Sequence, residues 1–235
     1  MARDAWAELE GPIGPLFIAW GTAGVTLVAR AEDASSFELD AQLRTGRPVT
    51  RVGHLPPGLA DQIARQLGGE WQPDLPIDFG GLTRFSATAL RKTMEIPWGE
   101  VRPYSWVARE IGSPRAVRAV GSSLGHNPLP CIVPCHRVVK ADGHIGEYGA
   151  GGPAAKIAML ATEDVDTDEL EALADAGIRY LGDDLADIFC YPTCRRARGM
   201  EGDRIVRFRA AEHALLAGYQ PCPDCRPVDA RVFAD

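Results

Sequence analysis

The sequence predicts a protein of mixed α and β structure in three parts. These are an α/β N-terminal domain, an α+β domain with a helix-turn-helix, and a small cysteine-bearing domain at the C-terminal end. Three observations support this division. The first third of the chain alternates strand and helix signals, the middle holds two short helices in succession, and four of the six cysteines lie in the last fifth. A chain of 235 residues is long enough for three small domains.

Residues 1–83 are predicted to form the α/β domain. The stretch PLFIAWGTAGVTLVAR places two apolar runs around a glycine-containing turn, which is typical of a β-hairpin. The stretch PPGLADQIARQLGGE carries apolar residues at helical spacing between prolines and glycines, which predicts a helix.

Residues 84–163 are predicted to form the second domain. SATALRKTMEIPWGE indicates a helix that begins at Ser86 and is broken near its proline. Two short helices follow, with Ser105 and Ser113 as candidate N-caps and Gly112 in the turn between them, as in a helix-turn-helix. CIVPCHRVVKADGHIG is then typical of a strand, a turn and a glycine loop.

The net charge of −7 does not exclude a nucleic-acid partner, because the acidic residues are concentrated in one segment. Residues 161–185 hold nine acidic residues and one arginine, a net charge of −8. Residues 91–150 hold eight basic and five acidic residues, a net charge of +3. Since a polyanion responds to the local balance of charge, a basic face remains open. We interpret 164–185 as an acidic linker with one helix, and 186–229 as the cysteine-bearing domain.

The sequence lacks signals for a membrane or secreted location. No apolar run approaches the length of a membrane span, and the first residues, MARDAWAELEGP, lack the apolar core of a secretory signal. We therefore expect a cytoplasmic protein with no membrane partner, in which thiols stay reduced and disulfides are rare.

The four C-terminal cysteines have the spacing of a metal site. Cys190 and Cys194 are spaced C-x3-C, Cys222 and Cys225 are spaced C-x2-C, and 27 residues separate the two pairs. Such pairs let four thiolates reach one tetrahedral ion, which predicts structural zinc. The alternatives are two disulfides or four buried thiols. A cytosolic setting disfavours the first, and the prolines and arginines beside the cysteines disfavour the second.

Two further cysteines lie four residues apart in the middle of the chain. Cys131 stands among apolar residues, where a thiol behaves as a small core side chain. Cys135 stands directly before His136, which makes it a candidate nucleophile, although a second metal site with nearby histidines stays open. Adjacent side chains on a strand point to opposite faces, so the pair needs a turn at Pro134 or a bridging water.

The stretch IPWGEVRPYSWVAREIGSPRAVRAVGSSLGHNPLPCIVPCHRVV resembles the O6-alkylguanine-DNA alkyltransferases, whose active-site motif is PCHRV. The resemblance runs through GEYGAGGPAAKIAMLATE and extends more loosely to GPIGPLFIAWGTAGVTLVA. It implies a ribonuclease-H-like N-terminal domain and a winged-helix-like α+β alkyltransferase domain. It also implies DNA repair by a monomer that moves an alkyl group, irreversibly and once per molecule, from O6-alkylguanine in duplex DNA to cysteine. O4-alkylthymine is expected as a second substrate, and the transfer needs no cofactor.

The resemblance also implies roles for individual residues. Cys135 is the alkyl acceptor, His136 takes its proton through a water, and Glu163 orients His136. Tyr104 supplies a proton or hydrogen bond to the departing guanine, and Asn127 ties the helix-turn-helix to the active-site strand.

The resemblance further places residues at the DNA and in the alkyl pocket. Because the target atom is buried in the duplex, the nucleotide must be flipped out, and Arg118 fills the vacated space. The other residues expected at the DNA are Ser105, Arg115, Ala119, Gly121 and Arg137. The residues expected to line the alkyl pocket are Pro130, Val138, Gly146, Tyr148 and Gly149.

The tail FCYPTCRRAR…RFRAAEHALLAGYQPCPDCRP resembles the zinc domain of the bacterial Ada adaptive-response regulator. In that family the first zinc-bound cysteine also accepts a methyl group from a DNA methylphosphotriester, which makes Cys190 a candidate second acceptor. The usual TTG lead-in is replaced here by LAD, so Asp187 would repel a phosphate. We therefore expect a structural zinc site.

Two functions other than repair are compatible with parts of the sequence. One is a non-catalytic DNA-lesion sensor or DNA-binding regulator whose cysteines are structural, and the other is a cysteine hydrolase that uses Cys135 and His136. The retained PCHRV motif disfavours the sensor, and no oxyanion hole is marked for the hydrolase.

Overall fold

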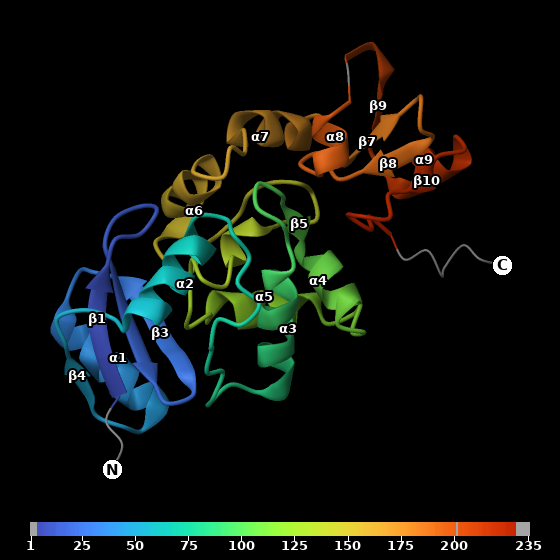
Figure 1. The fold of residues 1–235 in the computed structure, drawn as a ribbon. Coiled ribbons are helices and arrows are strands. Elements are labelled where there is room, and N and C mark those ends of the chain that lie inside the picture. The colour runs from blue at the N-terminus through green and yellow to red at the C-terminus, as the bar shows by residue number, and fades with distance from the viewer. Residues whose placement is uncertain (1–3, 201, 229–235) are drawn as a thin grey trace.

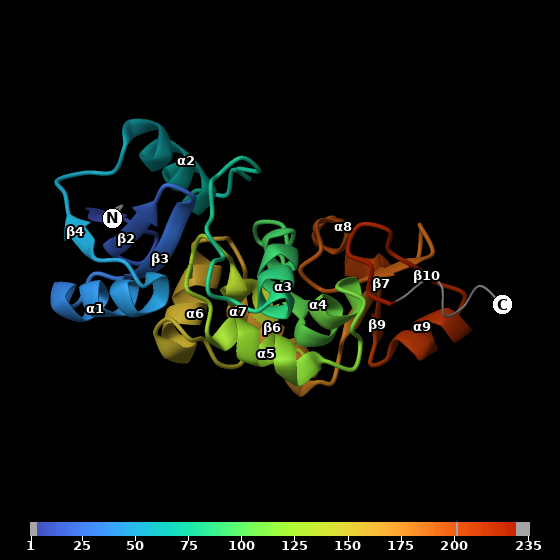
Figure 2. The ribbon, with the colours of Figure 1, turned by 90° about the horizontal axis from the view of Figure 1, so that it is seen from below.

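The structure is a computed structural model that describes residues 4–200 and 202–228. The chain forms three parts in a row, with a sheet at one end, helices in the centre and a second small sheet at the other end (Figures 1 and 2). This arrangement confirms the α/β N-terminal domain, the helical central domain and the small cysteine-bearing C-terminal module. The outermost residues of the first and last predicted domains, 1–3 and 229, lie outside the described residues.

The N-terminal domain is a four-stranded sheet with two helices. Its elements are β1 (Asp4–Leu9), β2 (Leu16–Gly21), β3 (Gly24–Arg30), α1 (Ala34–Thr45), β4 (Val49–Arg51) and α2 (Pro57–Leu67). The strand order is β3-β2-β1-β4, and only the β1–β4 pair is parallel. The predicted hairpin is therefore confirmed as β2 and β3, and the predicted helix as α2.

The two faces of this sheet bury different cores, because successive strand residues point to opposite sides. Trp6 and Phe17 face α1 and meet Phe37 there, with ring centroids 4.7–5.4 Å apart. Their neighbours Ala7 and Ile18 face the other way and join the core of the central domain. The sheet is thus packed firmly against the part of the chain that carries the candidate site.

The central domain contains the predicted helix-turn-helix. Its elements are α3 (Arg84–Met94), β5 (Arg102–Pro103), α4 (Tyr104–Glu110), α5 (Val117–Gly125), the 3-10 turn η1 (Cys135–Arg137), β6 (Val138–Val139) and α6 (Gly152–Ala161). Strands β5 and β6 pair in parallel, which places the start of α4 beside the segment that follows Cys135.

Three predicted helix starts need correction. Helix α3 begins earlier, because Thr83 accepts the backbone N–H of Ser86 and acts as the N-cap. Ser105 lies inside α4, since Pro103 precedes the helix and proline needs no partner for an N–H there. The carbonyl of Ser113 closes a separate turn, and α5 starts only after it.

The C-terminal module is a second small sheet with short helices. Its elements are α7 (Thr167–Asp175), which leads into it, then β7 (Tyr180–Asp183), β8 (Ile188–Cys190), α8 (Arg195–Arg198), η2 (Gly202–Arg204), β9 (Ile205–Phe208), α9 (Ala211–Leu216) and β10 (Gln220–Pro221). The strand order is β10-β8-β7-β9. Because β7 pairs with β8 and β9, the sheet begins within the predicted linker rather than at residue 186. Within the described residues, no helix has the length and apolarity that a bilayer crossing needs.

The C-terminal module is docked on the central domain through buried hydrogen bonds. The Trp106 indole N–H of α4 donates to the backbone carbonyl of Cys225 at 3.0 Å. The backbone N–H of Val101 donates to the Thr193 hydroxyl at 2.8 Å. The two parts therefore share an ordered interface, and the interface reaches the helix that begins at Tyr104.

Candidate functional site

Cys135 stands at the start of η1, where the chain turns after Pro134. This turn provides the break that the adjacent cysteine and histidine require. Asn127, just after α5, donates from Nδ2 to Cys135 Sγ and to the Val133 carbonyl, both at 3.1 Å. Its Oδ1 accepts the backbone N–H of Leu129 at 3.0 Å. The amide is therefore fully oriented, and it connects the helix-turn-helix to the thiol.

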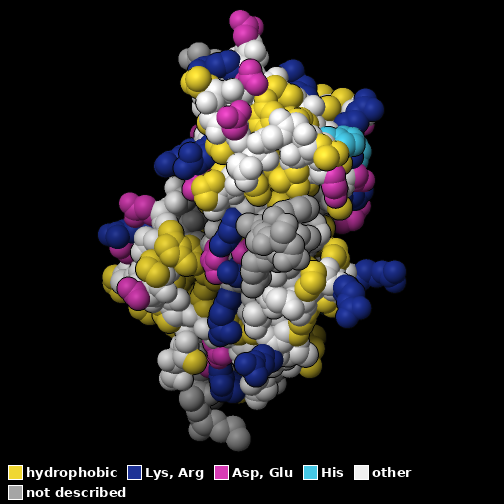
Figure 3. All heavy atoms as spheres, turned by 90° about the vertical axis from the view of Figure 1, so that its right-hand side faces the viewer, with side chains coloured by type: hydrophobic (Ala, Val, Ile, Leu, Met, Phe, Trp, Pro, Cys, Tyr) yellow, Lys and Arg dark blue, Asp and Glu magenta, His cyan; other side chains and the backbone are white. Residues whose placement is uncertain are grey.

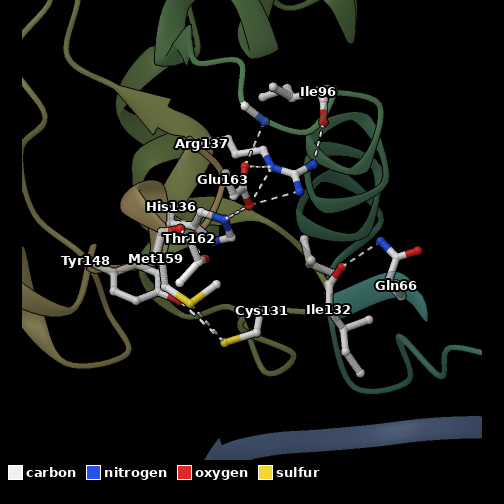
Figure 4. Close-up of polar contacts among 12 residues, drawn as sticks. Gln66, Ile96, Cys131, Ile132, His136, Arg137, Tyr148, Met159, Thr162 and Glu163 are labelled. Carbon is white, nitrogen blue, oxygen red and sulfur yellow. Dashed lines mark hydrogen bonds and ion pairs between the residues drawn. The ribbon is translucent and has the colours of Figure 1, made fainter. Parts of the chain in front are cut away.

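His136 and Arg137 share one buried carboxylate, that of Glu163 (Figure 4). Glu163 Oε1 lies 2.7 Å from His136 Nε2, and Arg137 Nε donates to Oε2 at 2.8 Å. The backbone N–H of Gly99 donates to the same carboxylate at 3.0 Å, and Arg137 also donates to the carbonyl of Ile96 at 2.7 Å. The side chains of His136, Arg137 and Glu163 are all buried, so their geometry is held tightly.

Burial dominates the acid–base behaviour of this group. It raises the pKa of Cys135, and the hydrogen bond from Asn127 and the charge of Lys156 oppose it only in part. Burial lowers the pKa of His136 despite the hydrogen bond to Glu163, so the imidazole is neutral at pH 7. Burial acts to raise the pKa of Glu163, but hydrogen bonds from His136 and Arg137 outweigh it and the pKa falls below its ordinary value. The site at rest thus holds a thiol, a neutral histidine and a carboxylate.

One nitrogen atom of this network has no hydrogen-bond partner in the part of the chain that the structure describes. His136 Nδ1 is one of two buried side-chain polar atoms that have no hydrogen-bond partner within the described residues. A neutral imidazole whose Nε2–H donates to Glu163 presents Nδ1 as an acceptor. This nitrogen is available to receive a proton.

Lys156 of α6 is a buried charged residue beside the site that the sequence analysis missed. Its side chain is fully buried, and Nζ donates to the carbonyls of Val138 at 2.6 Å, Ile145 at 2.7 Å and Glu147 at 3.2 Å. Burial lowers its pKa to about 8. The ammonium therefore joins β6 to the loop that leads to Tyr148, and its charge favours a thiolate at Cys135. A lone lysine in the apolar run AAKIAML was the available signal.

Tyr104 and the residues expected at the DNA lie on or between the two helices of the helix-turn-helix. Burial raises the pKa of Tyr104, and a negative charge on Cys135 adds to the rise, so the phenol stays protonated. Its ring lies 3.9 Å from the position that a Cβ on Gly121 would take, which shows how closely α4 and α5 approach. Arg115, Arg118 and Ala119 are all exposed, as a surface that meets DNA requires.

A cavity of about 320 Å³ opens onto Cys135. Asn127, Pro130 and Gly149 line it together with residues of strand β3. A Cβ on Gly149 would lie 2.6 Å from the carbonyl oxygen of Gly125, so only glycine allows the loop to approach α5 this closely. Of the residues expected in the alkyl pocket, Pro130 and Gly149 thus reach the cavity.

The other expected pocket and DNA residues lie elsewhere. Val138 and Tyr148 are buried and do not line the cavity, and Gly146 packs against the Lys140 side chain. The expectation that Arg137 contacts DNA needs correction. A buried guanidinium bound to Glu163 cannot also reach a phosphate, so Arg137 holds the carboxylate in place instead.

Cys131 lies in the core, apart from the thiol of Cys135. Its Sγ lies 4.0 Å from the Tyr148 hydroxyl and 3.9 Å from Met159 Sδ (Figure 4). Burial raises its pKa to about 12, which keeps the thiol protonated and unreactive. The interpretation of Cys131 as core packing agrees with this environment.

We expect the contact between the loop that holds His144 and Ile145 and helix α7 to stabilise the fold in a defined pH window. Glu171 accepts the backbone N–H of Ile145 and pairs with His144. The hydrogen bond between the His144 ring and the Glu171 carboxylate raises the pKa of His144 above 6.5. Burial acts to raise the pKa of Glu171, but the hydrogen bonds from His144 and Ile145 lower it below 4.5.

The sign follows from these two directions. The raised pKa of His144 gives stability that is complete below pH 6.5 and is lost as the pH rises through the folded-state pKa. The lowered pKa of Glu171 gives stability that is present above pH 4.5 and is lost as the pH falls through its folded-state pKa. Urea denaturation of the wild type and of Glu171→Gln should therefore differ most between about pH 4.5 and 6.5. A difference that does not change with pH would contradict the pairing.

The four C-terminal cysteines form one buried cluster. The Sγ atoms of Cys190, Cys194, Cys222 and Cys225 all lie within 4.8 Å of one another. All four side chains are buried, with exposures of 0–1%. Four thiols that converge from β8, α8 and the end of the chain form the donor set of a metal-binding domain.

Two family models match the chain. The model described as "6-O-methylguanine DNA methyltransferase, DNA binding domain" matches residues 84–165. The model described as "Metal binding domain of Ada" matches residues 175–228. The second match begins before β7, in agreement with the sheet described above.

Relatives and solved structures agree with the first model. A methylated-DNA–protein-cysteine methyltransferase of Mycobacterium tuberculosis is 36% identical over 159 residues, which is 67% of this chain and 91% of the relative. One from Methanosarcina barkeri is 33% identical over 61% of this chain and 87% of its own length. The crystal structure of M. tuberculosis OGT in complex with DNA is 34% identical, with a TM-score of 0.56, and covers 71% of this chain and 99% of that chain. With this identity over nearly the whole length of a relative, the chain belongs to the methylated-DNA–protein-cysteine methyltransferase family and carries a C-terminal Ada-type metal-binding domain.

Proposed function

We propose that the protein repairs duplex DNA by moving a methyl or other alkyl group from O6-alkylguanine, and also from O4-alkylthymine, to Cys135, once per molecule. One observation carries the choice of acceptor. Cys135 opens onto a cavity, accepts a hydrogen bond from Asn127, and stands beside the buried His136–Glu163 pair. Cys131 lacks these features and the C-terminal cysteines lie in the metal cluster.

The transfer is a single displacement at carbon. Cys135 Sγ forms a bond to the alkyl carbon while the bond from that carbon to guanine O6 breaks and its electron pair passes to the guanine. The thiol proton leaves through a water to His136 Nδ1, the open acceptor, and Glu163 stabilises the imidazolium that forms. The protonated phenol of Tyr104 donates to the guanine as its charge develops. A thioether has no easy reverse path, so the protein is consumed.

The DNA face supports nucleotide flipping from the duplex. The exposed Arg118 on α5 fills the space that the flipped nucleotide leaves, and Ala119 and Gly121 let the helix approach the minor groove. Ser105 and Arg115 supply further contacts to the backbone of the duplex. A relative has been crystallised in complex with DNA, which supports DNA as the partner of this chain.

The C-terminal cysteines fit zinc. Zinc–sulfur bonds of ~2.3 Å place the sulfurs of a tetrahedral site ~3.8 Å apart, within the spread of 4.8 Å measured here. Bound zinc would supply folding energy to a module that is too small for a large core. Cys190 is fully buried and follows Asp187, which supports a structural role over a second alkyl acceptor.

Some finer features belong to the same proposal. The N-terminal sheet, an antiparallel three-stranded unit with a parallel edge strand, supports the ribonuclease-H-like label. The α4–α5 pair beside β5 and β6 supports the winged-helix-like label. We propose a cytoplasmic monomer with domains at 1–83 and 84–163, followed by a linker that begins at residue 164 and a cysteine-bearing module whose sheet begins with β7, ahead of the predicted boundary at residue 186.

Peptide mapping by mass spectrometry tests the acceptor. After the protein is mixed with a duplex that bears O6-methylguanine, we expect one added methyl group on Cys135, in a ratio of one per protein, and none on Cys190. Cys135→Ala should bind the duplex but gain no mass. Binding without any adduct in the wild type would favour a lesion sensor, and repeated turnover on esters or amides would favour a hydrolase.

A further inference from the structure

A second cavity, larger than the one at Cys135, lies where the central domain, α7 and the C-terminal module meet. Its volume is about 470 Å³, and we call it the interdomain groove. The central domain contributes Ser105, Arg109 and Lys140, and the C-terminal module contributes Arg179 and Arg209. The groove exists only because the two parts are docked, and the proposed function assigns no role to it.

The lining of the groove is basic although the protein as a whole is acidic. Four cationic side chains line it, Arg109, Lys140, Arg179 and Arg209, against one acid, Glu212. This gives a local charge of 4 − 1 = +3, compared with −7 for the chain. Helix α7 contributes leucines to the lining rather than its acidic residues. A focused positive potential of this kind attracts an anionic ligand.

Three of the four cations are free to bind such a ligand. Arg109 is held by the carbonyls of Arg226 and Pro227. Arg179 donates only to main-chain carbonyls, at 3.3–3.5 Å. Within residues 4–200 and 202–228, no ion pair joins Lys140, Arg179 or Arg209 to a carboxylate.

The rest of the groove's lining is largely apolar. It includes Tyr180 and Tyr191, whose ring centroids lie 5.6 Å apart, together with Val139 and Leu173. Cationic side chains next to apolar surface can pair with the phosphates of a duplex backbone while the sugars pack on the apolar part. A small inorganic anion would use the cations but would gain nothing from the apolar part.

The groove adjoins the proposed DNA face. Ser105, which lines it, follows Tyr104 in the first turn of α4, and Tyr104 packs against α5. Helices α5 and α9 lie along the same lower edge of the molecule in Figure 2. Seen from the side of the C-terminal module, Lys and Arg side chains form a row down the middle of the molecule, with a few Asp and Glu side chains among them (Figure 3). A duplex held at α5 can thus continue toward the groove.

We propose that the interdomain groove binds the sugar-phosphate backbone of the same DNA duplex, beyond the damaged nucleotide. The footprint on DNA then extends from the central domain onto the C-terminal module. This inference rests on the proposed function, and it adds a second contact region that positions the protein on DNA but takes no part in the chemistry.

Salt-dependent binding to duplexes of two lengths tests the proposal. The variant Arg179→Gln/Arg209→Gln removes two free cations of the groove. With a duplex of ~30 base pairs we expect ~5- to 10-fold weaker binding, and the slope of log K against log salt should fall by ~2, because each lost phosphate contact removes ~0.9. With a duplex of ~10 base pairs centred on the lesion, wild type and variant should bind alike.

A control variant and a second groove variant make the result unambiguous. Arg51→Gln/Arg65→Gln makes the same change of charge on exposed residues of the N-terminal domain and should leave the slope unchanged. Because Arg179 also bonds carbonyls near the end of α7, Arg209→Glu is a second variant at an exposed residue that bears no such bond. Loss of slope with Arg209→Glu supports the groove.

Equal slopes for the wild type and both groove variants would overturn the proposal. Formation of the Cys135 adduct with the short duplex, measured in parallel, separates this failure from failure of the proposed function. If the adduct forms but the slope does not change, only the proposal that the groove binds DNA is refuted. If the wild type forms no adduct, the proposed alkyl transfer to Cys135 is refuted.

Discussion

Replacement of Lys156 by methionine is expected to abolish rapid transfer to Cys135 and to destabilise the protein by ~2–4 kcal/mol. Lys156 Nζ satisfies three backbone carbonyls in a fully buried position. Methionine has a similar length but no donor, so the carbonyls of Val138, Ile145 and Glu147 would be left unpaired. The loop that leads to Tyr148 would lose its attachment to β6, and Cys135 would lose the positive charge of Lys156 that favours a thiolate.

Two measurements check this prediction. Urea denaturation gives the loss in the free energy of unfolding, and single-turnover formation of the Cys135 adduct gives the rate of transfer. Lys92→Met is a matched control, because Lys92 lies at the surface of α3 in an ion pair with Glu95. That variant should change stability by less than ~1 kcal/mol and leave the rate unchanged. A Lys156→Met protein that transfers at the wild-type rate would show that Lys156 is structural only.

Removal of the metal is expected to unfold the C-terminal module and also to slow transfer at Cys135, by ~10-fold if about 1.4 kcal/mol of support is lost. A bound metal is expected to order this module, because the four cysteines come from the end of β8, the residue before α8 and the turn after β10. The Trp106 indole on α4 donates to the carbonyl of Cys225, which is itself one of the proposed ligands. The loss of that partner loosens the helix that begins at Tyr104.

A chelator titration followed by two signals tests this coupling. The fluorescence that is lost in a Trp106→Phe variant reports the environment of Trp106, because the chain holds five tryptophans, and adduct formation reports Cys135. Thr193→Val is the informative variant, since it keeps all four cysteines but removes the acceptor for the backbone N–H of Val101. We expect it to retain metal and to transfer at a rate between those of the wild-type and metal-free proteins. Unchanged transfer after complete loss of metal would show that the two parts act independently.

Part of the candidate site could be predicted because its signals are local in the sequence. Two tight cysteine pairs predicted the metal site from spacing alone, whereas the roles of Cys135 and Asn127 followed from the resemblance of the PCHRV motif and its flanking residues to the alkyltransferases. The hairpin and the helix α2 followed from apolar periodicity, which is also a local signal. Helix starts were less certain, because Thr83, Ser105 and Ser113 offer equivalent hydroxyl groups and only the tertiary arrangement selects among them.

The rest depends on contacts between distant segments. The resemblance placed Arg137 at the DNA, yet its guanidinium is bound by a carboxylate that lies 26 residues further along the chain. Lys156 could be recognised only when its three carbonyl partners came together. The docking of the C-terminal module joins α4 to residues more than 100 positions away, and no local pattern reports it.

The sequence by itself determined which reactive groups this protein has, namely the acceptor motif around Cys135 and the two cysteine pairs near its C-terminal end. Both are recognised from residues that lie close together along the chain, and the short spacing within each cysteine pair lets both thiolates reach one ion. Only the tertiary structure decided how that chemistry is supported. A buried charge is costly unless it is paired. Arg137 is therefore paired with Glu163, and Lys156 with the carbonyls of the loop. The basic interdomain groove likewise exists only after docking, since its cations come from both sides of the interface.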